Sequence, residues 1–306
     1  MARANKIDIS PRRTMMQESR GDRIFHGLMI ALTITTFIVI IYPLWFVVIA
    51  SISNSDLVNQ GKVTFMPVDI RFYGFQQIMQ DSRIWLGYRN TIFYVVVGTI
   101  LNMAITMPAA YALSRPDFKA RNPVMMYFVF TMYFSGGLVP TYMVVNKLGL
   151  INTPWILIVM VAINTYNLII ARTFIQNTIP NDLYESAMLD GANHFTIFWH
   201  IVLPLSKAII AVMALYYAVG QWNSYFNAMI FLQNENLYPL QLVLKEILIA
   251  SESTVGGSGE TILQQYRLAN QLKYVSVIVS SVPVLLLYPF VQKYFAQGVM
   301  IGSLKG

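Results

Sequence analysis

Long apolar segments without Asp, Glu, Lys or Arg alternate with short polar segments along this chain. Six charge-free windows, each at least 19 residues long, cover residues 24–55, 90–114, 122–146, 148–171, 208–234 and 274–292. A transmembrane helix needs about 20 mostly apolar residues, and a backbone inside lipid must be helical or closed into a barrel. Since no period-2 alternation runs through the windows, the pattern predicts an all-α integral membrane protein with six transmembrane helices.

Two of the windows contain residues that interrupt helices. The segment SGGLVP (135–140) places two Gly and a Pro inside the third window, so we expect that span to bend or break there. Close helix packing at the Gly pair is an equally good explanation of those residues. In the fourth window, Gly149, Asn152 and Pro154 delay the expected start of the helix.

The composition agrees with lipid as the solvent of most of the chain. Of the 306 residues, 56% are hydrophobic and 11% are charged, whereas soluble domains carry about 25% charged residues. The absence of Cys excludes disulfides and thiolate metal sites, and three His residues are too few for a His-rich metal site. The first window is too long, and lies too far from the N-terminus, for a cleaved signal peptide.

The distribution of basic residues predicts the orientation in the membrane. Six of the 21 Lys and Arg residues lie in the tail 1–23, and three more lie in the loop 115–121. By the positive-inside rule, both termini and the loops 115–121 and 172–207 are cytoplasmic, and the loop 235–273 is external. The predicted organisation is therefore an N-terminal tail (1–23), a transmembrane domain (24–297) and a C-terminal tail (298–306). We interpret the basic tail as a topology signal near anionic lipid, not as a nucleic-acid site.

The chain lacks the motifs of a self-sufficient transporter or enzyme. No Asp, Glu, Lys or Arg lies within the windows, although ion-coupled transporters usually carry such groups there. No phosphate-binding G-x-x-x-x-G-K-[ST] loop occurs, and the GGSG segment (256–259) is typical of a flexible turn. His194 and His200 have no metal-ligand spacing to a carboxylate pair. A stand-alone secondary transporter or channel stays open as the alternative function, and a membrane enzyme is a weaker third.

A short polar segment, 181–204, separates the fourth and fifth windows. Asn181 is a good helix N-cap, so we expect a short helix over 182–190. Gly191 permits the left-handed residue that ends such a helix. Asn193 can then cap a second short helix over 194–200. The pattern predicts a cytoplasmic helical hairpin.

The same segment carries a spaced motif. It reads Glu185-Ser186-Ala187, two residues, Asp190-Gly191-Ala192, eight residues, then Ile-Val-Leu-Pro (201–204). This resembles the EAA loop of permease subunits of ATP-binding-cassette (ABC) importers, in which E-A-A and D-G-A are followed by I-x-L-P. Ser186 replaces the middle Ala, a small-for-small change.

Other segments are similar to the carbohydrate permeases of the maltose-importer type, in particular to their shorter subunit. They are the tail QKYFAQGVMIGSLKG (292–306), the segment AAYALSRPDF (109–118) and the pair Asn90-Thr91. The segment 134–153 resembles the branch that imports complex oligosaccharides, including fragments of acidic polysaccharides. The resemblance implies the fold of a type I ABC importer permease, with six spans and a cytoplasmic coupling-helix hairpin.

The resemblance also implies partners and residue roles. The chain would form a pathway with a second, homologous permease in the bacterial cytoplasmic membrane, and a solute-binding protein would deliver the oligosaccharide from outside. The hairpin would dock on a cytoplasmic ATPase dimer, which holds the ATP and Mg²⁺, so no cofactor and no catalytic residue is expected in this chain. Glu185 would pair with a basic residue of the ATPase, Ala187 and Gly191 would allow close packing, and Asp190 would cap or brace the turn. Lys293 and Lys305 would add contacts to the ATPase or anchor the tail at the interface.

Polar and aromatic residues inside the windows are candidates for the substrate pathway. Asn164 and Asn167 lie three residues apart, which places them on one face of a helix. A second cluster consists of Gln221, Trp222, Asn223, Tyr225 and Asn227. Amides pair with sugar hydroxyls and aromatic faces stack on sugar C–H surfaces, but amides also hold membrane helices together and aromatic residues also mark the lipid interface. In the external loop, residues 251–263 would reach towards a binding protein.

Overall fold

The computed structural model describes residues 19–253 and 267–286, with the single positions 289 and 292. Every regular element within these residues is helical, as predicted. Three helices are long and apolar enough to cross a membrane: α1 (Arg20–Ile52), α4 (Ser82–Ser114) and the helix Arg267–Leu286, called the C-terminal helix below. They cover most of the first predicted window, all of the second and most of the described part of the sixth.

Several predictions fall on other parts of the chain. Most of the N-terminal tail, most of the stretch 251–263 with its GGSG segment, and the C-terminal tail with Lys293 and Lys305 lie outside the described residues. The roles predicted for them stay predictions.

The third window is bent where the sequence predicted a break. Helix α5 (Arg121–Tyr133) and helix α6 (Leu138–Lys147) meet at 116°. Gly137 lies at the junction with a φ of +85°, and no atom lies within 4 Å of the position of a Cβ there. Within the described chain, Gly137 therefore allows the change of direction and makes no close helix contact.

The fourth and fifth windows are not continuous helices, which corrects the prediction of one unbroken helix in each. The fourth contains α7 (Trp155–Val159) and the start of α8 (Thr165–Thr178). The fifth contains α12 (Lys207–Trp222) and α13 (Phe226–Phe231). Helix α8 begins at Asn164, whose side-chain oxygen accepts a hydrogen bond from a backbone N–H of α8. Helix α12 ends at Asn223, whose amide donates to the Val219 carbonyl. Such local bonds compete with continuation of the helix.

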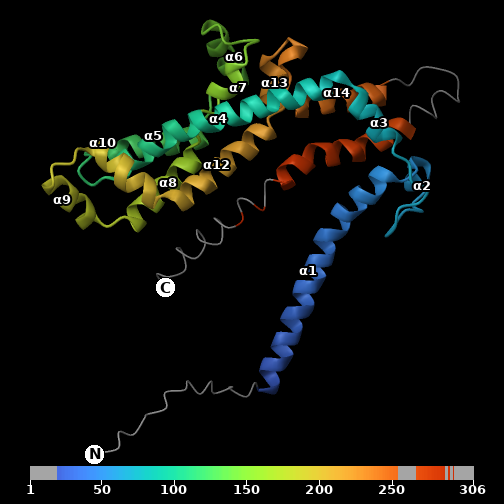
Figure 1. Ribbon diagram of the computed structural model, residues 1–306, viewed down its shortest axis with the longest axis horizontal. Helices are drawn as coiled ribbons and strands as arrows, with labels where there is room; N and C mark the ends of the chain where they lie inside the picture. Colours follow the sequence, from blue (N-terminus) through green and yellow to red (C-terminus); the bar gives the residue numbers. More distant parts are fainter. Residues whose placement is uncertain (1–18, 254–266, 287–288, 290–291, 293–306) are drawn as a thin grey trace, which may run out of the picture.

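Helix α4 is the centre of the bundle, with α8, α12 and α14 (Leu240–Ser253) packed against it. Figure 1 shows α9 (Asn181–Leu189) and α10 (His194–Ile197) at one end of the bundle, and α2 (Ser55–Asn59) and α3 (Tyr73–Gln80) at the other. The largest core cluster joins α4, α8, α12 and the segment 181–202 through buried side chains such as Ala110, Leu168, Ala171, Ile197 and Met213. Van der Waals packing and small residues of this kind hold helices together in lipid, where the hydrophobic effect between helices is absent.

The Asn90-Thr91 pair fixes the segment that leads into α14. The Asn90 amide donates to the carbonyls of Asn236 (2.8 Å) and Tyr238 (3.0 Å), and the Thr91 hydroxyl accepts from the backbone N–H of Leu240 (2.8 Å). Part of the predicted external loop 235–273 is helical, because it contains α14. The apolar face of α14 packs between α4 and the C-terminal helix.

Replacing Thr91 by Val should destabilise the chain, because it leaves the buried Leu240 N–H without an acceptor. An unsatisfied buried donor costs about 1–3 kcal/mol. Thr91→Ser is the matched control, since it keeps the hydroxyl. Thermal denaturation of the purified protein in detergent should give a lower midpoint for Thr91→Val than for Thr91→Ser. Equal midpoints would contradict the role of the hydroxyl.

Helix α1 packs against the rest of the described chain near its C-terminal end. All side chains of residues 20–45 are exposed, and Figure 1 shows the helix diverging from the bundle. At its end, Phe46 packs edge-to-face on Tyr274 at 6.0 Å, and Ile49 and Ala50 join a small core with Val58 and Val63.

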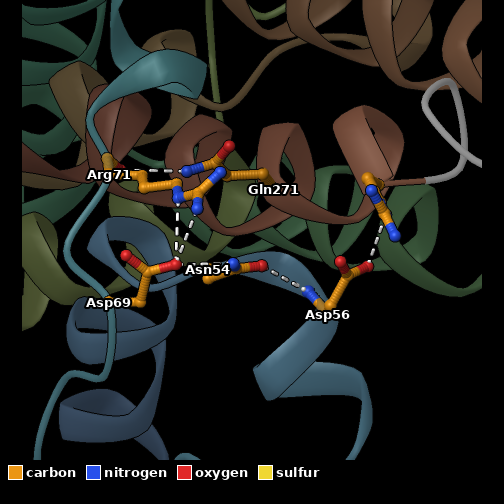
Figure 2. A network of polar contacts seen from close by, with 6 residues as sticks. Asn54, Asp56, Asp69, Arg71 and Gln271 are labelled. Carbon is orange, nitrogen blue, oxygen red and sulfur yellow. Dashed lines mark hydrogen bonds and ion pairs between the residues drawn. The ribbon is translucent and has the colours of Figure 1, made fainter.

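A polar network fastens the segment that follows α1 to the C-terminal helix (Figure 2). Asp69 accepts hydrogen bonds from Asn54 (2.7 Å) and from Arg71 (3.0 Å), and these two partners lower the pKa of its carboxyl. The Gln271 amide donates to the Arg71 carbonyl (3.0 Å), and Arg267 pairs with Asp56 (2.7 Å). The two chain segments are thereby joined at the end of the bundle opposite α9.

Candidate functional sites: the hairpin and the polar cavity

The segment 181–204 folds into a helical hairpin. Helix α9 is followed by α10, a π-helical turn over Phe198–Val202 and α11 (Leu203–Leu205). The predicted helix boundaries are correct to within a few residues. Asn181 is not the N-cap, however: Pro180 occupies that position, with φ −62° and ψ 147°. Proline suits it, because its φ is already fixed there and no helical hydrogen bond needs its missing N–H.

The turn between the two helices depends on Gly191, whose φ is +85°. The N–H of Gly191 donates to the Met188 carbonyl (3.0 Å), and the N–H of Ala192 donates to the Ala187 carbonyl (2.9 Å). These bonds satisfy the last carbonyls of α9. Asn193 caps α10 as predicted, since its side-chain oxygen accepts the Thr196 N–H at 2.8 Å. Asp190 is the C-cap residue of α9, and its backbone N–H donates to the carbonyls of Ser186 and Met188.

The six motif residues divide between solvent and the bundle. Glu185, Ser186, Asp190 and Gly191 are exposed, whereas Ala187 and Ala192 are half-buried against the main core cluster. The small side chains therefore serve packing of the hairpin on its own bundle as well as any outside contact.

The sequence analysis missed an apolar tip on the hairpin. Leu189 is 90% exposed, and Leu183 and Met188 are also exposed. Met188 and Leu189 are the two residues between the E-S-A and D-G-A triplets, so an apolar pair inside a polar motif was the signal that could have found them. A single exposed apolar side chain is normal on a protein surface, whereas neighbouring ones form a patch that can mark a contact site. Leu189 adjoins the exposed Met188, so the two side chains form such a patch.

A cavity of about 290 Å³ lies between α4, α8, α12 and the segment leading into α13. It brings together six of the seven predicted pathway residues, which are Asn164, Asn167, Gln221, Asn223, Tyr225 and Asn227. Trp222 is not among them: its side chain is buried away from the cavity, and its indole N–H donates to the Ser280 carbonyl at 3.0 Å.

Hydrogen bonds fix the walls of this cavity. Asn164 caps α8 and does not lie on its face, which corrects the predicted arrangement with Asn167. The Tyr217 hydroxyl accepts the Asn164 N–H (3.2 Å) and bonds to the Thr106 hydroxyl (2.7 Å). The Gln221 amide donates to the Leu157 carbonyl (3.3 Å).

Further lining residues were not predicted, and they are Asn102, Val161, Tyr216, Tyr217, Gly220, Ser224 and Phe226. Asn102 could have been recognised as a buried amide in the charge-free window of α4. None of the lining side chains is charged, so the cavity offers amide and hydroxyl hydrogen bonds and aromatic surface. Among the described residues, no three His, Asp or Glu side chains lie close enough to hold a metal ion.

The hairpin and the cavity lie at opposite ends of the same helices. Helix α8 starts at the cavity and ends just before the hairpin, and α12 starts just after the hairpin and ends at the cavity. With 14 residues in α8, the separation is about 20 Å at 1.5 Å per residue. Two continuous helices therefore connect the two candidate sites.

Comparison with known proteins identifies the class of protein to which this arrangement belongs. Residues 84–301 match the family model of the binding-protein-dependent transport system inner membrane component. The chain belongs to this family, and it is a permease subunit of an ABC importer. The resemblance to carbohydrate-importer permeases seen in the sequence is confirmed.

Individual relatives cover nearly the whole chain. The polygalacturonan/rhamnogalacturonan transport system permease protein YtcP of Bacillus subtilis is 38% identical over 93% of this chain and 99% of its own length. Protein LplC of the same organism is 35% identical over 95% of this chain and 98% of its own length. A crystal structure of a bacterial ABC transporter involved in the import of the acidic polysaccharide alginate superimposes with a TM-score of 0.78, at 33% identity, over 90% of this chain and 98% of the other.

Proposed function

We propose that this chain, together with a second permease, forms the pathway for oligosaccharide fragments of an acidic polysaccharide in an ATP-driven importer. The single observation that carries the proposal is the near full-length similarity to YtcP, a polygalacturonan/rhamnogalacturonan permease. The similarity to the alginate importer points to the same class of substrate. All three polysaccharides contain sugar acids, so the shared substrate chemistry is a hydroxyl-rich chain with carboxylates.

The polar cavity supports a role in passing the sugar. Its amides and its aromatic residues suit hydroxyls and sugar C–H faces, and it contains space of about 290 Å³. Because its lining carries no cation, we propose that this subunit contacts the hydroxyl face of the sugar. The second permease or the binding protein would then recognise the carboxylates.

The hairpin supports a role in energy coupling. Glu185 is exposed on α9 beside the apolar tip of Met188 and Leu189, which gives a charged and an apolar contact on one small surface. We propose that this surface docks on a cytoplasmic ATPase dimer, which binds ATP and Mg²⁺ and carries out hydrolysis. When the ATPase subunits close, the docked hairpin would move α8 and α12 and change the opening of the cavity.

The proposed membrane arrangement follows from the charge distribution. The tail 1–23 and the loop 115–121 together carry nine basic residues. The hairpin lies at the same end of the bundle as that loop, as Figure 1 shows for α9 and the start of α5. We propose six membrane crossings, with both termini and the hairpin cytoplasmic. In this arrangement the third, fourth and fifth crossings are broken helices, of the kind tolerated where the backbone lines a cavity or is packed in protein.

Reconstituted uptake tests the proposed function. The chain should co-purify in mild detergent with an ATPase, a second permease and a binding protein. In liposomes, the complex should accumulate oligogalacturonides or alginate fragments only with ATP inside, and excess neutral oligosaccharide of equal length should compete poorly. Uptake by this chain alone without ATP would indicate a secondary transporter or channel. ATP-driven uptake of neutral sugars only would retain the importer and refute the acidic substrate.

A further inference from the structure

One motif has no role in the proposed function: AAYALSRPDF (109–118), which ends α4 and begins the loop to α5. Its Arg115 is the C-cap residue of α4 and is only 8% exposed. A guanidinium is charged at any physiological pH, and a buried charge is costly unless partners compensate it. The partners of Arg115 therefore indicate what the buried charge is for.

Two side chains, Tyr184 and Asp117, contact the guanidinium of Arg115. Its guanidinium carbon lies 3.7 Å from the centroid of the Tyr184 ring, and its Nε donates to an Asp117 carboxylate oxygen at 3.2 Å. Tyr184 is a residue of α9, directly before the motif residue Glu185, and is 2% exposed. The cation of Arg115 thus binds the hairpin directly to the end of α4, in a desolvated place where cation–π attraction is strongest.

Aromatic contacts extend the attachment across the hairpin. The Tyr184 ring stacks on Tyr111 of α4, with centroids 6.2 Å apart and an interplanar angle of 27°. Tyr111 packs in turn on Phe198, at 5.6 Å, in the second half of the hairpin. Its hydroxyl lies 3.3 Å from a ring nitrogen of His194, whose other nitrogen is 3.9 Å from Asp117. Both halves of the hairpin are therefore held by the last turn of α4 and the residues that follow it.

Helix α4 also reaches the polar cavity, because Asn102 lies in the cavity wall, about three turns before the end of the helix. A rigid attachment between the hairpin and α4 makes the two move together. A loose attachment would let the hairpin swing without moving the cavity wall.

We infer that Arg115 is a positioning residue for transport: through its contact with Tyr184 it holds the hairpin at a fixed angle to α4. Movement of the hairpin on the ATPase then reaches the cavity through α4 as well as through α8 and α12. The inference rests on the proposed docking of the hairpin on an ATPase. On this inference, the segment 109–118 helps to couple ATP hydrolysis to sugar movement.

The test compares Arg115→Gln, which removes the cation, with Arg115→Lys, which keeps it, and Tyr184→Leu, which removes the ring, with Tyr184→Phe, which keeps it. Each variant is purified as the assembled importer and reconstituted with an acidic oligosaccharide and its binding protein. Arg115→Gln and Tyr184→Leu should lower the amount of sugar moved per ATP hydrolysed about tenfold, while the ATPase stays bound. Tyr184→Phe should restore the ratio, and Arg115→Lys should restore it in part, because a planar guanidinium stacks on a ring better than an ammonium.

A distance measurement provides the readout that loss of stability alone would not move. The chain contains no Cys, so Asp182→Cys on the hairpin and Ile100→Cys on α4, both exposed in the isolated chain, can carry spin labels in an otherwise cysteine-free permease. The distance distribution between them in the assembled importer should be narrow in the unchanged background and broad in the Arg115→Gln and Tyr184→Leu variants. Should Arg115→Gln fail to assemble, Arg115→Lys and the two Tyr184 variants decide the question by the same two readouts.

An unchanged transport ratio together with an unchanged distance distribution in Arg115→Gln would overturn the inference. Failure of the proposed docking would look different. In that case Glu185→Lys would leave both ATPase binding and transport intact, whatever the Arg115 variants do.

Discussion

Glu185→Lys is expected to separate this permease from its ATPase. Glu185 is exposed on α9 and lies a short way before Met188 and Leu189 of the apolar tip, so reversing its charge places a cation where the proposed partner surface is basic. Loss of a charged contact at the centre of an interface typically costs about 2–5 kcal/mol, which corresponds to a loss of affinity of about thirtyfold or more. ATPase co-purification and ATP-driven uptake should fall together.

Matched controls separate docking from folding of the hairpin. Asp182→Lys makes the same charge reversal on the same helix, outside the motif, and should retain the ATPase. Gly191→Trp should also displace the ATPase, because it adds bulk to an exposed turn whose φ of +85° disfavours large residues. Gly191→Asn tolerates that φ with less bulk and should retain more of the ATPase. Normal co-purification and transport in both Glu185→Lys and Gly191→Trp would refute the docking assignment.

Gly220→Trp should block the polar cavity. Gly220 lines the cavity on α12, and no atom lies within 4 Å of the position of a Cβ there, so an indole can enter the open space without displacing the backbone. Sugar uptake should fall to near background while the ATPase and the second permease still co-purify. The measurement is ATP-driven uptake in liposomes, beside quantification of the co-purifying subunits.

Gly220→Ala is the control, because a methyl group leaves most of the cavity free and should leave uptake close to that of the unchanged protein. Full uptake by an assembled Gly220→Trp complex would exclude the cavity from the pathway. Loss of the second permease from the complex would instead place Gly220 in the contact between subunits.

The parts of the structure that follow local rules were predictable from the sequence. The Gly191 turn, the Asn193 cap and the bend at SGGLVP depend on the backbone preferences of one or two residues, and all three are present. The separation of α7 from α8 was not predicted, because an Asn inside an apolar window can either face a neighbouring helix or cap a new one. Asn164 takes the second role since its side chain and the Tyr217 hydroxyl both bond to the backbone there.

The residues that line the cavity were predictable only in part, for a different reason. Residues 221–227 cluster along the chain, so their polarity stood out. Trp222 nevertheless points to the C-terminal helix, since neighbouring residues of a helix end face different directions. Asn102 is far from Asn164 in the sequence, and only tertiary packing brings the two to one cavity. Likewise, neither motif alone indicated that Arg115 and Tyr184 are in contact.

The attachment of α1 at one end has a consequence for how the chain fits a bilayer. With 33 residues, α1 is about 50 Å long, whereas the hydrocarbon layer is about 30 Å thick. A helix longer than the layer tilts, bends or thickens the bilayer around it. Because α1 packs against the rest of the described chain around Tyr42–Ala50, and the side chains of residues 20–45 are exposed, the tilt of its N-terminal part can change with the thickness of the membrane. Hydrophobic mismatch can thus be absorbed by α1 while α4, α8 and α12 keep their mutual packing.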